Sequence, residues 1–450
     1  MTAKKLHIVH CVDTEGPLYE SLTATFERLE QAFGISLPPS REILSRIQKG
    51  TYPLEGHEEA AMQMFAPHLL SLNDDWRKID DMLLEMRSPE FRKEYCDSFG
   101  KGWKFNWFVM DHVGFDTNPR RRDIGYHNIF DHYQSMIRDE PTGGDEINWH
   151  FHPMSTHREA QICATSYLNS PHLMESLVRR VIDKNWFPTS FRAGFHTERP
   201  DSHWFLEQWI PFDFSNQATS FHNTVTPKQD LPGRFGDWRR APNDWSHYHP
   251  SHDDYQNPGH CRRLIFRCLN VGTRIRILTQ DEVNSAFARA ANGKETVLAF
   301  CNHDFRDMRA DVKHVHQLLL NASRQYPEVT WQHSGAKESA QSVLPVEAQS
   351  THFQLDVQLE DSKSLLTVKS NQKSFGPQPF LAIKTHDKRY ITDNFDVQQP
   401  RYEWSYTFDR HSIKLQSVEA VGVAFTTPHG KCKVVTISPS GEVNKDSYYP

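Results

Sequence analysis

The sequence has few of the features that mark secreted or membrane proteins. Its seven cysteines never stand in Cys-x-x-Cys spacing, and an odd number cannot all pair, so we expect reduced thiols. No apolar run is long enough to span a bilayer, and no apolar leader segment follows Met1. These absences predict a cytoplasmic protein without a membrane span.

The chain also has little excess charge of either sign. It contains 51 basic and 57 acidic residues, which give a net charge of -6, and it has no long run of lysine or arginine. Without a broad basic field, nucleic acid and membrane surfaces are not expected as partners. We therefore expect the partner to be a small or neutral molecule.

What is present is a chain of 450 residues, 37% of them hydrophobic, which predicts two domains with a sizeable core. Strand-like and helical stretches alternate over residues 1–333, and polar residues repeatedly end the strands. This order predicts an α/β, barrel-like domain of parallel strands, with a helical insertion at about residues 18–102. A polar linker is expected at 333–339. Alternating apolar residues then predict a C-terminal β-sandwich over residues 345–450.

The most informative stretch is Trp149–Pro153, where His150 and His152 are two residues apart in an expected strand. Side chains alternate along a strand, so both imidazoles face one side and can share a metal ion. A single pair of this kind is more often two ordinary half-buried histidines, so the hypothesis needs partners elsewhere. His247 and His249 form a rival pair, but they stand in an expected loop next to a proline.

Two carboxylates follow the first expected strand, Leu6–Val12. They are Asp13 and Glu15. The carboxyl ends of parallel strands are where α/β folds place their chemistry. Either carboxylate alone is more typical of a helix cap. Together with His150 and His152, however, they predict a metal centre.

Residues 234–263 mix aromatic and charged side chains with proline and glycine. The segment is too polar for a core and too aromatic for a linker. One interpretation is a substrate loop, because aromatic faces beside hydrogen-bonding groups suit a sugar ring; the other is a surface loop whose aromatic residues form its own small core. The candidate substrate-binding residues of this loop are Trp238, Arg239, Trp245 and Tyr248.

Four segments together resemble the NodB-homology polysaccharide deacetylases, and among them the WbmS-like branch. The segments are Val12–Glu15, Trp149–His152, Phe191–Gly194 and Phe300–His303. They occur in the family's order over roughly residues 5–330, and Asp213–Ser215 resembles the strand that follows the family's arginine motif, which makes Asp213 a further candidate for substrate binding. The resemblance implies a distorted (β/α) barrel of NodB type and a metal-dependent deacetylase.

The resemblance also implies a role for each polar residue. One divalent ion, zinc by ligand type with cobalt or nickel accepted, would be bound by Glu15, His150 and His152. Asp13 would be the general base, Arg192 would hold it ionised, and His303 would be the general acid. Asp304, the next residue, is a candidate to tune His303.

The chain departs from the family's pattern at two ligands. The family has adjacent aspartates, whereas the second carboxylate here is Glu15, two residues beyond Asp13. The family's histidines are four residues apart, but position 154 is Met154, so the second histidine ligand is His152 or, as the alternative, His157.

We therefore expect a metal-dependent carbohydrate N-deacetylase acting on a sugar nucleotide, a lipid-linked glycan or an O-antigen-type precursor. A deformylase or an O-deacetylase on the same scaffold is an alternative. A different barrel amidohydrolase is another, although such enzymes usually carry the histidine pair on the first strand. The last alternative is a non-catalytic glycan-binding protein whose sandwich binds the ligand.

Overall fold

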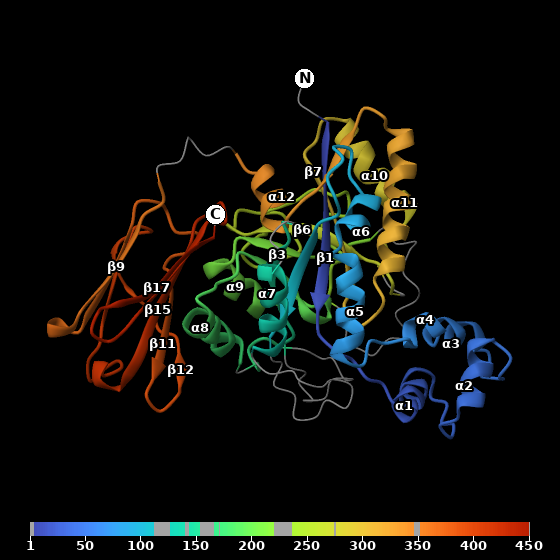
Figure 1. Ribbon diagram of the computed structural model, residues 1–450, viewed down its shortest axis with the longest axis horizontal. Coiled ribbons are helices and arrows are strands. Elements are labelled where there is room, and N and C mark those ends of the chain that lie inside the picture. The colour runs from blue at the N-terminus through green and yellow to red at the C-terminus, as the bar shows by residue number, and fades with distance from the viewer. Residues whose placement is uncertain are drawn as a thin grey trace.

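The computed structural model describes residues 4–111, 127–139, 144–153, 166–170, 172–219, 236–273, 276–345 and 352–449. These residues form a parallel β-barrel surrounded by helices, a group of helices at the carboxyl end of the barrel, and two antiparallel sheets beside it (Figure 1). None of the helices in this part of the chain is long and apolar enough to cross a lipid bilayer.

Seven parallel strands close into the barrel. They are β1 (Lys5–Thr14), β2 (Phe105–Met110), β3 (Glu146–Phe151), β4 (Ser190–Ala193), β5 (Phe212–Asn216), β6 (Leu264–Asn270) and β7 (Thr296–His303). Each strand pairs with the next, and β7 and β2 both pair with β1. An eighth strand, β8 (Thr330–His333), pairs with the start of β1, whereas β2 pairs with its end. The predicted domain of parallel strands is confirmed, with β1 in contact with three neighbours.

Side chains along each strand point alternately into the barrel and towards the helices that surround it. The apolar interior consists of Val9, Cys11, Phe108, Phe212, Phe214, Leu264, Phe266, Cys268, Val297, Ala299 and Cys301. The strands β3 and β4 contribute none of these residues, because their apolar side chains, such as Trp149 and Phe191, belong to the outer core. Their inward positions are therefore polar, which places His150 and Arg192 inside the barrel.

The expected linker near Gly335 is instead a structural element. Helix α12 (Ala336–Ser342) follows β8 directly, and Ala336 and Ala340 belong to the same apolar cluster as the barrel interior. The main-chain N–H of Ala336 donates to the side chain of Asn106 at 2.6 Å, near the amino end of β2. The prediction of a linker at 333–339 was wrong because two small apolar residues of this polar stretch, Ala336 and Ala340, pack against the apolar interior of the barrel.

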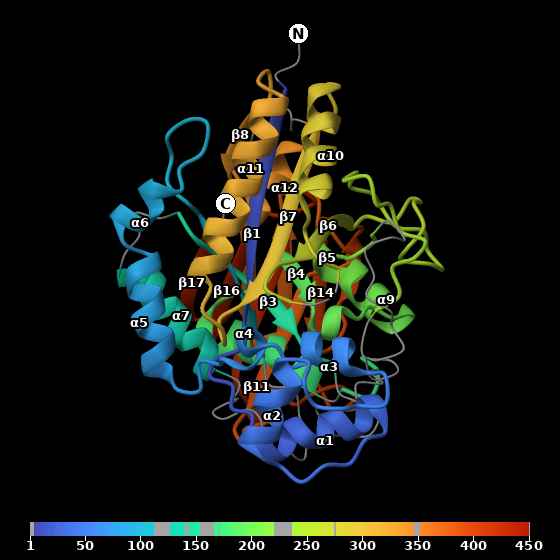
Figure 2. The same ribbon diagram turned by 90° about the vertical axis from the view of Figure 1, so that its right-hand side faces the viewer.

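Twelve α-helices and one 3-10 turn complete the barrel domain in the described residues. The helices around the barrel are α5 (Trp76–Met86), α6 (Pro89–Glu94), α7 (Asn128–Asp139), α8 (His172–Lys184), α9 (Pro200–Trp209), α10 (Gln280–Ala291) and α11 (Arg309–Gln325). Helix α12 lies at the amino end of the barrel, and the 3-10 turn η2 (Gly194–His196) follows β4 at the carboxyl end. The helices α1 (Leu22–Phe33), α2 (Arg41–Gln48), α3 (Glu58–Met64) and α4 (Pro67–Leu70) have a core of their own. Figures 1 and 2 both show α1 to α4 at the end of the barrel where β1 and β7 finish.

Two antiparallel sheets follow and share a second core. One sheet contains β9 (Leu355–Glu360), β10 (Leu365–Ser370), β13 (Asp396–Gln399) and β14 (Glu403–Thr407). The other contains β11 (Phe380–Thr385), β12 (Tyr390–Ile391), β15 (Val418–Thr426), β16 (Cys432–Ile437) and β17 (Val443–Tyr449), and the short turns are η5 (Asp361–Lys363) and η6 (Leu415–Ser417). The alternating burial of β9 fits the predicted pattern of a sheet with one face in a core.

The second sheet packs against the barrel domain. The ring of Phe380 lies against that of Phe187, with centroids 5.2 Å apart, and the Tyr390 hydroxyl donates to Asp183 at 3.1 Å. Gly422 lies so close to α8 that an added Cβ would be 2.5 Å from a methyl group of Val181. The second sheet is therefore held against α8 and Phe187 by apolar contacts and by one hydrogen bond.

Candidate metal centre

Three predicted ligands meet at the carboxyl end of the barrel. The Nε2 atom of His152 lies 2.9 Å from Oε1 of Glu15 and 2.9 Å from Nε2 of His150. All three side chains are buried, and their ligand atoms lie within 4.8 Å of one another. In the described residues, this three-ligand cluster is the one group of three or more His, Cys, Asp or Glu side chains that could hold a metal ion.

The rival pair His247 and His249 is not part of this cluster. The Nδ1–H of His249 donates to the main-chain oxygen of Arg263 at 3.0 Å, and the ring of His247 packs with its centroid 5.8 Å from that of Phe266. The alternative ligand His157 lies outside the described residues.

The hydrogen bonds of His150 prepare it as a ligand. Its Nδ1 lies 3.1 Å from the main-chain oxygen of Arg192, so Nδ1 carries the proton and Nε2 presents its lone pair to the cluster. Burial lowers the pKa of His150 to about 3, so the ring is neutral at physiological pH. A neutral imidazole oriented by a carbonyl is the usual form of a histidine ligand, and the donor set therefore fits a metal ion.

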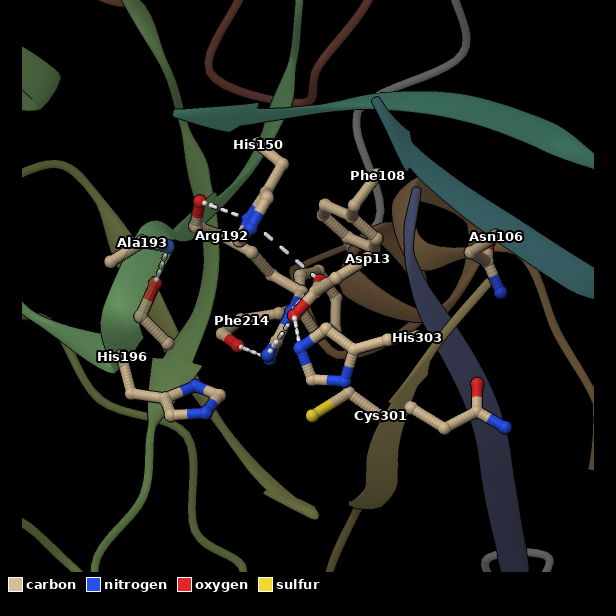
Figure 3. Close-up of polar contacts among 12 residues, drawn as sticks. Asp13, Asn106, Phe108, His150, Arg192, Ala193, His196, Phe214, Cys301 and His303 are labelled. Atoms are coloured by element: carbon tan, nitrogen blue, oxygen red, sulfur yellow. Dashed lines mark hydrogen bonds and ion pairs between the residues drawn. The ribbon is translucent and has the colours of Figure 1, made fainter. Parts of the chain in front are cut away.

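Asp13 and Arg192 form a buried ion pair beside the cluster (Figure 3). The Nε and Nη2 atoms of Arg192 lie 2.7 and 3.0 Å from the two carboxylate oxygens, and Nη1 donates to the main-chain oxygen of Phe214 at 2.6 Å. Burial by itself would raise the pKa of Asp13, but the charge of Arg192, with a smaller contribution from His150, holds it well below its usual range. Asp13 is therefore ionised, as predicted for a residue paired with Arg192.

His303 faces the ion pair from the end of β7 (Figure 3). Its Nε2 lies 3.8 Å from Asp13 Oδ2 and 3.9 Å from Glu15 Oε1. Its side chain is 12% exposed, whereas that of Asp13 is fully buried. Burial lowers the pKa of His303 well below 6.5 although Asp13 opposes this effect, so the imidazole is neutral at neutral pH. A neutral imidazole can act as an acid only after it has accepted a proton.

The predicted aromatic substrate residues are buried in two different cores: Trp238 and Tyr248 belong to a small core within the loop, whereas Trp245 belongs to the outer core of the barrel domain. Trp238, Trp245 and Tyr248 are only 1%, 2% and 6% exposed, and their polar atoms bond within the protein. The indole N–H of Trp238 donates to the main-chain oxygen of His196 at 3.1 Å, and the hydroxyl of Tyr248 donates to the main-chain oxygen of Tyr255 at 2.8 Å. These rings offer no free face for a sugar, and the second interpretation of the loop describes Trp238 and Tyr248. Packing explains the difference, because these two rings lie in one small core with Tyr255, while Trp245 packs in the outer core of the barrel domain.

The two charged candidates for substrate binding also have structural partners. The side chain of Arg239 is 77% exposed and pairs with Asp237 at 2.9 Å. Asp213 points out of the barrel because its neighbours Phe212 and Phe214 point in. It lies 2.7 Å from Arg263, in a network of fully buried charges. The alternation of β5 alone would have predicted this outward direction.

His196 is a residue near the centre that the sequence analysis left without a role. Its ring centroid lies 6.5 Å from that of His303, and Gln217 donates to its Nδ1 at 2.9 Å. Phe195 and His196 have φ angles of 54° and 53°, in the left-handed region, and the Phe195 ring packs 4.4 Å from that of His152. Figure 3 shows the His196 ring turned towards His303 and Cys301. The sequence feature that could have identified His196 is its position as a polar residue shortly after Arg192, at a strand end.

The chain matches no protein-family model and no curated protein. The fold and the site thus define a parallel β-barrel protein with a candidate metal centre at the carboxyl ends of its strands. The NodB type of the barrel stays a prediction that rests on the four sequence motifs.

Proposed function

We propose that the protein is a metal-dependent hydrolase that removes an N-acetyl group from a carbohydrate. The observation that carries the proposal is that the three-ligand cluster lies within 4 Å of both a buried Asp–Arg pair, through His150 and Asp13, and a partly exposed histidine, through Glu15 and His303. Amide hydrolysis needs an activated water, a stabilised oxyanion and a proton for the leaving nitrogen. A divalent ion in the cluster would supply the first two; we propose zinc, because two imidazoles and one carboxylate suit it, with cobalt or nickel as substitutes.

The proton is moved by residues of the chain itself. Asp13 would accept a proton from the attacking water and share it with His303, whose Nε2 lies 3.8 Å from the carboxylate. His303 is neutral before the reaction, so it can hold this proton and then give it to the leaving nitrogen. Arg192 would keep Asp13 oriented throughout. One proton is thereby transferred from the water to the amine.

The carbohydrate part of the proposal rests on the sequence motifs. The candidate substrates are sugar nucleotides, lipid-linked glycans and O-antigen-type precursors. The test is to load the purified protein with Zn²⁺ and to measure acetate release from a panel of N-acetylated sugars and sugar nucleotides. We expect about one zinc per chain and acetate release, and we expect His150→Ala to lose both.

Matched substrates separate the proposal from its alternatives. Formyl or O-acetyl analogues that are cleaved while the N-acetyl sugars are not would change the acyl group but keep the hydrolase. A zinc-loaded protein that cleaves none of these compounds, yet binds one of them, would show a glycan-binding protein instead.

A further inference from the structure

We propose that Asp304 is a positioning residue that fixes Glu15 and thereby sets the metal affinity of the three-ligand cluster. The inference rests on the proposed function only in requiring a metal at this cluster. Asp304 directly follows His303 at the end of β7 and is fully buried. From the sequence we expected it to tune His303, but its carboxylate bonds to the loop that carries Glu15.

The carboxylate holds two consecutive main-chain N–H groups of that loop. Its Oδ1 accepts from the N–H of Glu15 at 2.8 Å, and its Oδ2 accepts from the N–H of Gly16 at 3.0 Å. Hydrogen bonds to an ionised acceptor are the strong ones, and two of them to adjacent residues fix the direction of the backbone. The Cα of Glu15 is therefore set by a residue that is 289 positions away in the sequence.

Asp304 is itself held by two other parts of the molecule. The hydroxyl of Tyr133, a buried residue of α7, donates to Oδ2 at 2.8 Å. The side chain of Asn73, between α4 and α5, donates to the main-chain oxygen of Asp304 at 2.9 Å. Asp304 is thus held by bonds that do not involve the Glu15 loop, as is required of a residue that supports a metal ligand.

The position of Glu15 explains why such support is needed. The strand β1 ends at Thr14, whose hydroxyl bonds to Phe108, so Glu15 lies beyond the regular sheet. The next residue, Gly16, has a φ of 71° and packs against the ring of Trp76. A glutamate outside the sheet has one more rotatable bond than an aspartate inside it. Fixing its backbone limits the positions that its carboxylate can take.

The experiment measures metal binding in the full-length protein, with Zn²⁺ alone as the probe. The protein is stripped with a chelator and titrated in competition with a chromophoric chelator. We expect Asp304→Asn to bind zinc roughly 10- to 100-fold more weakly, because the amide has one acceptor oxygen for two N–H groups. The Co²⁺ absorption spectrum should also change, because the carboxylate ligand moves.

Asp145→Asn is the matched control. The Asp145 carboxylate bonds to Arg92 at 2.8 Å and accepts the N–H of Phe105 at 3.0 Å, at the amino end of the barrel. Its loss should lower the melting temperature without changing zinc affinity or the cobalt spectrum. A purely structural role of Asp304 would give the same result as this control.

Each outcome decides the proposal. Wild-type affinity and an unchanged cobalt spectrum in Asp304→Asn would overturn it and leave the proposed function standing. A wild-type protein that binds no zinc would overturn both. If zinc binding depends on Asp304 but no acyl group is released, only the proposed function fails. Should Asp304→Asn not fold, Tyr133→Phe removes one donor to the same carboxylate; roughly three- to tenfold weaker binding is expected, and unchanged binding overturns the proposal.

Discussion

At the scale of single residues, one residue that is not a ligand orients two polar groups of the centre. The main-chain oxygen of Arg192 orients His150, and the guanidinium of Arg192 orients Asp13. One residue of β4 therefore controls both a proposed ligand and the proposed base. Both groups are buried, so neither can replace its protein partner by water, and the loss of that partner costs free energy.

The proposed division of roles predicts that Asp13 and His303 are needed for catalysis but not for metal binding. Each transfers a proton, a contribution worth roughly 10²- to 10⁴-fold in rate, whereas neither belongs to the three-ligand cluster. We expect Asp13→Asn and His303→Ala to retain zinc, as measured by elemental analysis, and to lose acetate release by that factor. Loss of zinc in His303→Ala would show that the imidazole is a ligand.

Gly194 predicts a steric effect at the second histidine ligand. A Cβ at this position would lie 2.4 Å from Cδ2 of His152, much closer than real side chains approach. We therefore expect Gly194→Ala to displace His152 and to lower zinc affinity at least tenfold in a competition titration, as for other changes that disturb a ligand's support. Gly335→Ala, where an added Cβ would be even more crowded but at the other end of the barrel, should leave zinc affinity unchanged.

At the scale of elements, β1 and α12 define the two ends of the barrel. The strand β1 extends from the β8 contact at one end to Asp13 at the other, so it connects the closed end with the centre. Helix α12 closes the amino end by two alanines. In its first turn, the main-chain N–H of Lys337 donates to a carboxylate oxygen of Glu146 at 3.0 Å.

The close approach of Glu146 to Gly335 predicts how α12 responds to substitution. An added Cβ would lie 1.7 Å from Oε1 of Glu146, so Gly335→Ala should lower the free energy of unfolding by about 1–3 kcal/mol, a usual result of overpacking. The cost should shrink in a Glu146→Ala background, where the obstructing carboxylate is absent. Urea unfolding of the four proteins in this double-mutant cycle measures the coupling. Equal costs in both backgrounds would mean that the carboxylate of Glu146 is not what opposes the added methyl group.

The part of the site that can be predicted from the sequence also differs from element to element. The residues at the ends of β1, β3, β4 and β7 could be predicted because strand alternation and chain order are local properties. The burial of Trp238 and Tyr248 could not be predicted, because a group of aromatic side chains can equally well bind a ligand or pack into a core of its own. The role of Asp304 was also hidden, since its partner Glu15 is far away in the sequence.

At the scale of the whole molecule, buried histidines away from the centre are distributed along the closed end of the barrel. His10 accepts from the Trp103 indole at 2.9 Å and bonds to Asn302 at 2.9 Å, so both of its ring nitrogens have partners. His7 bonds to Ser334 at 2.8 Å, and His333 bonds to the main-chain oxygen of Tyr95 at 2.9 Å. Burial lowers the pKa of His7 and His10 to about 4, and that of His333 to about 3.

These histidines predict that the protein loses stability in mild acid. Above pH 6.5, the ordinary pKa of histidine, the folded and the unfolded chain are both neutral at these positions. Below it, the unfolded chain binds protons that the folded chain refuses, so the free energy of unfolding falls by about 1.4 kcal/mol per pH unit for each such histidine. The loss continues until the pH reaches about 4, where the folded His7 and His10 begin to titrate.

A single substitution isolates one of these contributions from those of the metal centre. His10→Gln keeps a donor and an acceptor in the side chain but cannot bind a proton, so its unfolding free energy should depend less steeply on pH than that of the wild type. The difference in slope should be about 1.4 kcal/mol per pH unit between roughly pH 6 and pH 4.5. Urea unfolding of chelator-treated protein at several pH values measures both slopes. Parallel slopes would mean that His10 is already protonated in the folded protein, and that its bond to Trp103 is not formed in solution.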